Sequence, residues 1–236
     1  VTMSGKAATT WIRAFLSSEM MPEPLNFTKF LSFIFLESVK YIRSKLGITG
    51  LDQVQQSILE RIIHSSGDFS LQSSIRFSPS ACENAIIALQ NGAKILTDTY
   101  MAEAAISPMA KRTINTDIQC ILGMAPTSID STLTTRSAIG MRNIWLDFEL
   151  KENSLNAPFV VIGSSPTALM SLLNLVESGY GKPSLIIGMP VGFIGVSESK
   201  SRLLNSECPY IVLEGSKGGA SLAAAATNAL LRAAEN

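Results

Sequence analysis

The sequence predicts an α/β fold of three layers, in which a mostly parallel central sheet of about five strands carries helices on both faces. Two observations lead to this prediction. From Pro79 onward, short and nearly continuous apolar runs alternate with amphipathic segments. Apolar runs of this length are typical of parallel strands buried on both faces, and regular alternation of strand and helix is typical of doubly wound sheets.

The helices are expected where apolar residues recur at helical spacing, and the strands where they form short unbroken runs. Asp52 is a suitable first residue for a helix, and Gly47 and Gly92 each end one. The predicted helices cover residues 28–46, 52–64, 79–91, 127–149, 166–178, 196–205 and 219–234. The predicted strands cover residues 94–98, 118–122, 159–163, 184–188 and 209–213.

The chain has 236 residues, of which 46% are hydrophobic and 16% are charged. This length suits one α/β domain or two small ones. Because there is no low-complexity linker and no internal repeat, residues 27–236 are predicted to form a single domain. Residues 1–26 are predicted to form an irregular N-terminal extension. The low charge density favours a homo-oligomer.

Composition argues against several classes of protein. Lysine plus arginine and aspartate plus glutamate both total 19, so no basic excess favours nucleic acid. Cys82, Cys120 and Cys208 are far apart, which makes a metal site improbable and a reducing cytoplasm the expected compartment. The most apolar stretch, 211–234, contains charged residues, and no membrane span is predicted.

Ligands of doubly wound sheets gather outside the carboxyl ends of the strands. The most distinctive residues of this chain follow its predicted strands, at 98–101, 163–167, 188–195 and 214–219. The loop at 163–167 joins a strand directly to a helix, so its free backbone N–H groups could hold an anion, although a tight turn with Pro166 explains it equally well. Lys217 among glycines suggests a second anion site or a solvated turn.

His64 is the only histidine, and it is the obvious candidate for proton transfer near neutral pH. It falls near the C-terminus of the helix at 52–64, where the helix dipole favours a protonated imidazole. A lone histidine is more often an ordinary helix-end residue, so its role stays open from the residues alone. Arg136 suits a carboxylate ligand or a plain surface position, and Ser38 has no base beside it.

The chain resembles the precorrin-8X methylmutase family, also called precorrin isomerase, or cobalt-precorrin-8 methylmutase in the anaerobic route of cobalamin biosynthesis. The resemblance covers about residue 30 to the end. The segments that carry it are 34–38 (Ile-Phe-Leu-Glu-Ser), 61–64 (Arg-Ile-Ile-His), 75–79, 97–101, 135–138 (Thr-Arg-Ser-Ala), 162–169, 188–200 and 217–220. Positions 164 and 165 depart from the family, which usually has Gly-Asn-Ala-Pro-Thr where this chain has Gly-Ser-Ser-Pro-Thr at 163–167.

The resemblance implies an isomerase that moves a methyl group between adjacent ring carbons of a tetrapyrrole, precorrin-8X or cobalt-precorrin-8, without a cofactor. It implies that His64 is the catalytic proton donor and that the enzyme is a homodimer. The residues that it implies for substrate binding are Ser38, Arg136, Thr135, Ser164, Ser165, Met101 and Lys217.

Two alternatives belong to other classes of protein. The first is a non-catalytic tetrapyrrole-binding protein on the same fold, against which the presence of His64 argues. The second is a nucleotide-dependent α/β enzyme. The chain lacks both GxGxxG and GxxxxGK[ST], the loops that cradle nucleotide phosphates, so this alternative is disfavoured.

Overall fold

The computed structural model describes residues 27–128, 134–151 and 157–235. The chain divides into two units, residues 1–41 and 42–236. Helix α2 (Phe27–Leu46) begins in the first unit and ends in the second, which contains the sheet. The extension predicted over residues 1–26 lies outside the described residues, and the single domain predicted from residue 27 stays a prediction.

The sheet of the second unit has six strands among the described residues, in the order β1-β6-β5-β4-β2-β3. Five are parallel and match the predicted strands: β2 (Ile95–Thr97), β3 (Ile118–Cys120), β4 (Phe159–Ile162), β5 (Leu185–Gly188) and β6 (Tyr210–Leu213). The sixth, β1 (Ile75–Phe77), was not predicted and pairs antiparallel with β6. It has three residues and lies at the edge of the sheet, with Arg76 exposed, so it lacks the continuous apolar run of the central strands.

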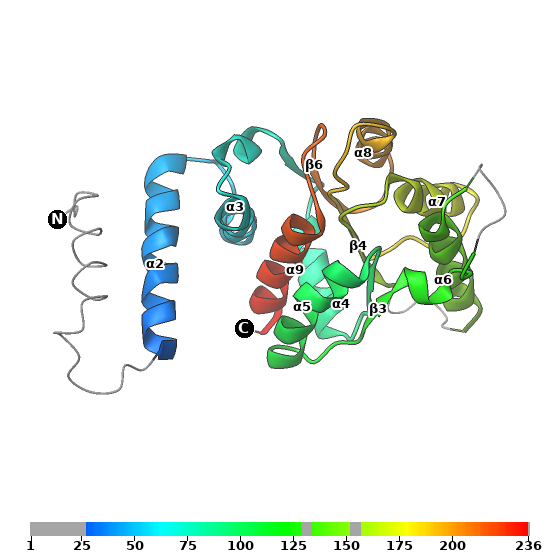
Figure 1. Cartoon of the computed structure of the whole chain (residues 1–236), viewed down its shortest axis with the longest axis horizontal. Helices are drawn as coiled ribbons and strands as arrows, with labels where there is room; N and C mark the ends of the chain where they lie inside the picture. The colour runs from blue at the N-terminus through cyan, green and yellow to red at the C-terminus, as the bar shows by residue number, and fades with distance from the viewer. Residues whose placement is uncertain (1–26, 129–133, 152–156, 236) are drawn as a thin grey trace. The chain divides into compact units, whose positions relative to one another are not determined.

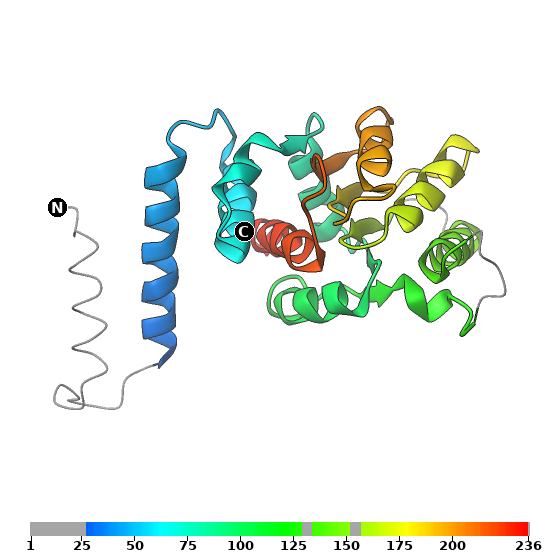
Figure 2. The same ribbon diagram turned by 45° about the horizontal axis from the view of Figure 1, so that its top comes forward.

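Two hydrophobic cores cover the two faces of the sheet, which confirms the three layers (Figures 1 and 2). Phe159 and Val161 of β4 face one core, and Val160 and Ile162 face the other, because successive side chains of a strand point to opposite faces. The first core contains α3 (Gln53–Ser66), α4 (Ala81–Gln90), α5 (Tyr100–Arg112) and α9 (Ala220–Glu235). The second contains the 3-10 turn η2 (Ile121–Met124), α6 (Arg136–Lys151), α7 (Pro166–Glu177) and α8 (Val196–Leu204).

Helix α9 approaches the end of β4 very closely. A Cβ atom added at Gly163 would lie 2.6 Å from the Cα atom of Ala220, so only glycine fits at this strand end.

In the part of the chain that the structure describes, no helix, α9 included, combines the length and apolarity needed to cross a membrane.

Two helices differ from the sequence prediction. Helix α5 was not predicted, because Pro108 lies inside it and proline normally disrupts a helix interior. Thr99 begins α5 by accepting a hydrogen bond from the Ala102 backbone N–H, so Met101 lies in the first turn of a helix. Helix α6 begins at Arg136 instead of residue 127, which places Arg136 at a helix start and not inside a helix.

Candidate functional site

The order in which the chain adds strands to the sheet changes side between the neighbouring parallel strands β2 and β4. From β2 it passes through α5 to β3 on one side, and it later builds β4, β5 and β6 on the other side. Doubly wound sheets bind ligands at such a switch point, outside the carboxyl ends of the strands. The loops that follow β4, β5 and β6 form a row along this edge, because neighbouring parallel strands end together.

Asp98 lies at the switch point and is a residue whose contacts the sequence did not reveal. Its Oδ1 atom accepts a hydrogen bond from the Gly163 N–H at 3.1 Å. Its Oδ2 atom accepts from the N–H groups of Ser164 and Ser165, at 2.6 and 2.7 Å. The side chain is buried, and this burial raises the pKa of the Asp98 carboxyl, while the three N–H bonds oppose the rise.

The sequence analysis considered the backbone N–H groups of this loop as donors to a ligand anion. In the structure, the N–H groups of residues 163–165 donate to the Asp98 carboxylate instead. That expectation is wrong for the backbone, because all three N–H groups already have an acceptor within the chain. Contacts of the Ser164 and Ser165 side chains with a substrate stay predictions. The signal in the sequence was an acidic residue directly after a buried strand.

Four hydroxyl groups form a closed ring beside Asp98. Thr135 and Ser137 lie 3.1 Å apart, and Ser137 and Ser165 lie 2.6 Å apart. Ser165 and Thr167 lie 3.0 Å apart, and Thr167 returns to Thr135 at 2.6 Å. Thr135 and Ser165 also accept hydrogen bonds from the Ala138 and Ala168 N–H groups in the first turns of α6 and α7. The hydroxyl ring thus joins the starts of these two helices and fixes the predicted site residue Thr135.

Replacing Thr167 by valine is expected to open the hydroxyl ring and to lower the free energy of unfolding by about 1 kcal/mol. Valine keeps the branched shape but leaves Thr135 and Ser165 without one partner each. Urea denaturation measures the change. Thr167→Ser retains the hydroxyl and should remain within about 0.5 kcal/mol of the wild type. A loss in Thr167→Val of less than about 0.5 kcal/mol would show that the ring contributes little to stability.

Arg136 follows Thr135 and is exposed. Its Nε–H donates to the carbonyl oxygen of Pro126 at 2.9 Å, which anchors one side of the guanidinium group. Thr135 and Thr167 also line a cleft of about 490 Å³ between α6 and α7. The predicted contact between Arg136 and a carboxylate stays a prediction.

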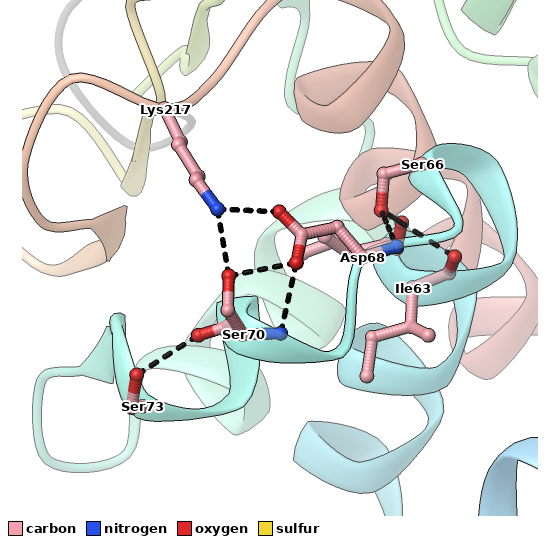
Figure 3. Close-up of polar contacts among 7 residues, drawn as sticks. Ile63, Ser66, Asp68, Ser70, Ser73 and Lys217 are labelled. Atoms are coloured by element: carbon pink, nitrogen blue, oxygen red, sulfur yellow. Dashed lines mark hydrogen bonds and ion pairs between the residues drawn. The ribbon is translucent and has the colours of Figure 1, made fainter.

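Lys217, in the loop after β6, binds the segment that follows His64. Its Nζ donates to Asp68 Oδ2 at 2.6 Å and to Ser70 Oγ at 2.7 Å (Figure 3). Asp68 also accepts from the Ser70 N–H and hydroxyl. These contacts, the Lys217 hydrogen bond first, lower the pKa of the Asp68 carboxyl to about 2. The ion pair between residues 149 positions apart therefore persists throughout the neutral range.

His64 lies in the last turn of α3, near the C-terminus of the helix, as predicted. The helix ends at Gly67, which has the left-handed conformation (φ 68°) and donates to the carbonyl oxygen of Ile63. Buried Ile62 and Ile63 hold this turn in the core, while His64 is exposed. The Ser66 hydroxyl accepts a hydrogen bond from the Asp68 N–H at 3.2 Å, so the His64 turn is connected through Asp68 to Lys217.

Large apolar side chains are exposed along the same edge. Met101, at the start of α5, is 67% exposed, and Phe193 and Ile194, in the loop after β5, are 89% and 90% exposed. The remaining predicted residue, Ser38, belongs to the unit that ends at Tyr41, where its hydroxyl donates to the carbonyl oxygen of Ile34 at 2.9 Å. Its contact with the other site residues stays a prediction.

Comparison with known proteins gives a consistent result. A sequence model described as precorrin-8X methylmutase matches residues 34–233. The cobalt-precorrin-8 methylmutase of Synechocystis sp. is 35% identical, over 84% of this chain and 94% of that protein. The precorrin-8X methylmutase of Pseudomonas aeruginosa is 36% identical, over 84% of this chain and 93% of that protein.

Among solved structures, the precorrin-8X methylmutase of Thermus thermophilus superposes with a TM-score of 0.73 at 31% identity. The match covers 85% of this chain and 96% of that one. Methylmutases are isomerases that move a methyl group within one molecule. From the extent of these matches, the chain belongs to the precorrin-8X methylmutase family.

Proposed function

We propose that this chain converts precorrin-8X or cobalt-precorrin-8 into the isomeric corrin, hydrogenobyrinate or cobyrinate, by moving a methyl group between adjacent ring carbons. His64 is the proton donor of this reaction. The proposal rests on the position of His64. Its side chain is exposed, and Asp68 and Lys217 connect its turn to the loops that follow the parallel strands. Any cobalt enters as part of the substrate.

The chemical contribution required of the protein is a proton, which His64 donates to the substrate. Protonation of a ring nitrogen beside the migrating methyl group draws electron density from the conjugated system, so that the bond to one carbon breaks as the bond to its neighbour forms. The proton is given up afterwards, and substrate and product have the same composition. General acid catalysis of this kind contributes about 10²–10⁴-fold, and holding the macrocycle in a reactive conformation contributes further.

The remaining site residues bind the macrocycle. Arg136 and Lys217 are proposed to contact its peripheral carboxylates, and the Asp68 and Ser70 contacts leave one N–H of the Lys217 ammonium group for that role. Met101 is proposed to pack on the apolar ring surface, which is consistent with its exposure. Thr135, Ser164 and Ser165 supply hydroxyl groups, and Ser38 a hydrogen bond near His64 or the ring.

We also propose that the protein is a cytoplasmic homodimer. The low content of charged residues supports self-association. Cys82, Cys120 and Cys208 are buried and carry free thiols, which suits a reducing compartment. Sedimentation of the purified protein measures the oligomeric state directly, and a monomer at micromolar concentration would contradict the proposal.

Visible absorption tests the reaction. Purified protein is mixed separately with metal-free precorrin-8X and with cobalt-precorrin-8, and the spectrum of the corrin is followed with time. Conversion of either substrate supports the proposal, and the faster one identifies the physiological route. Binding of both macrocycles without conversion would reject catalysis and favour the tetrapyrrole-binding alternative.

A further inference from the structure

Lys200 is a buried lysine to which the proposed reaction assigns no role. It lies on α8, and only 1% of its surface is exposed. Its Nζ donates to the carbonyl oxygen of Gly215 at 2.8 Å and to that of Lys217 at 2.7 Å. Among the described residues, no carboxylate forms an ion pair with Lys200.

A buried ammonium group without a carboxylate partner is unfavourable for folding. Burial lowers the pKa of Lys200 to about 8. An apolar residue of similar size would avoid this penalty, but it could not donate to the two carbonyl groups. Lys200 therefore attaches the loop at 214–219 to α8, which an apolar residue could not do.

That loop is held on several sides. The Gly192 N–H donates to the carbonyl oxygen of Ser216 at 3.1 Å, and the Gly219 N–H donates to that of Met189 at 2.9 Å. Lys200 fixes the backbone of Lys217 itself. From this fixed backbone the Lys217 side chain extends to Asp68 and Ser70, in the segment that follows His64.

We propose that Lys200 is a positioning residue for methyl migration, which holds the backbone at Gly215 and Lys217 so that the Lys217 ammonium group reaches Asp68 and the substrate. The contacts run from α8 through the loop at 214–219 to the segment after α3. This role rests on the proposed function, since it assumes that Lys217 contacts a carboxylate of the macrocycle.

A double-mutant cycle tests the role. Lys200→Met, Lys217→Met and the double variant are compared with the wild type on the substrate that the wild type converts. We expect each single change to raise KM about tenfold, as expected for a lost hydrogen bond to a charged group, with kcat within about twofold. The double variant should be little worse than either single variant, because both changes interrupt the same chain of contacts. An additive effect of about 100-fold, or an unchanged KM in Lys200→Met, would overturn the proposal.

A role confined to stability gives a different result, because it would lower the active fraction, and hence the apparent kcat, without raising KM. Lys200→Gln is the second variant if Lys200→Met does not fold, since its amide donates hydrogen bonds but is too short to reach both carbonyl groups. It should raise KM less than Lys217→Met does. A folded Lys200→Gln protein with wild-type KM would also overturn the proposal.

Hydrogen exchange provides a readout that does not depend on turnover. In Lys200→Met, the Gly219 amide is expected to exchange about tenfold faster than in the wild type, because the loop opens more often. If the wild type converts neither macrocycle, the proposed function fails while this measurement still reports on the loop. Unchanged exchange at Gly219 would count against Lys200 as the residue that holds it.

Discussion

Replacement of His64 by alanine is expected to lower kcat for methyl migration by about 10²–10⁴-fold, the usual contribution of a general acid. KM should change little, because the groups assigned to substrate binding lie elsewhere in the site. The imidazole is exposed while its neighbours Ile62 and Ile63 are buried, so the substitution removes a reactive group and leaves the core of α3 intact. The measurement is the initial rate of corrin formation by visible absorption.

Ser65→Ala is the matched control for His64→Ala. Ser65 is also exposed in the last turn of α3, and it is assigned no part in binding or catalysis. Its variant should retain the wild-type rate and the wild-type unfolding midpoint. A His64→Ala protein that is folded, binds the macrocycle and converts it at the wild-type rate would exclude His64 as the proton donor.

The positions of the central strands along the chain follow from sequence patterns that are local. The runs at 159–162 and 185–188 carry no polar side chain because both faces of β4 and β5 are buried, and such runs are recognisable without knowledge of their partners. Strand β1 was not predicted because its formation depends on pairing with β6, from Ile75 opposite Leu213 to Phe77 opposite Ile211. A strand of three residues has no periodicity from which it could be recognised.

The sequence predicts where the candidate site lies, but it did not reveal the contacts within this part of the chain. The rule that ligands gather at the carboxyl ends of parallel strands selects the loops that contain Asp98, Ser164 and Lys217. The contact between Asp98 and Ser164 joins residues 66 positions apart, and that between Lys217 and Asp68 joins residues 149 apart. Such pairings depend on the folded chain. For this reason the sequence left open whether the loop at 163–167 binds a ligand anion, whereas in the structure a carboxylate of the same chain accepts its N–H groups.

Substitution of Asp98 is expected to have the largest effect on stability. Asp98→Ala removes the acceptor of three N–H groups at the end of β4, and each buried donor left without a partner costs about 1–3 kcal/mol. A loss of about 3 kcal/mol or more in the free energy of unfolding is therefore expected, together with a displaced loop at 163–167. Asp98→Asn should lose about a third of this amount, because the amide oxygen can still accept from Ser164 and Ser165 while its NH₂ group faces Gly163. Urea denaturation measures both changes.

The difference in the free energy of unfolding between wild type and Asp98→Ala should depend on pH, and the sign of this dependence provides a second test. Because burial raises the pKa of the Asp98 carboxyl, the folded state retains this proton at pH values where the unfolded chain has lost it. The stability that Asp98 contributes, relative to alanine, is then greatest below the unfolded pKa of 3.8 and decreases as the pH rises through the folded pKa. Asp117→Asn is the control, since the Asp117 side chain is exposed, and its stability should differ from that of the wild type by less than about 0.5 kcal/mol. A difference between wild type and Asp98→Ala that grows with pH would mean that the three N–H bonds outweigh burial. The Asp98 carboxylate would then act as a bound anion that stabilises the switch point of the sheet.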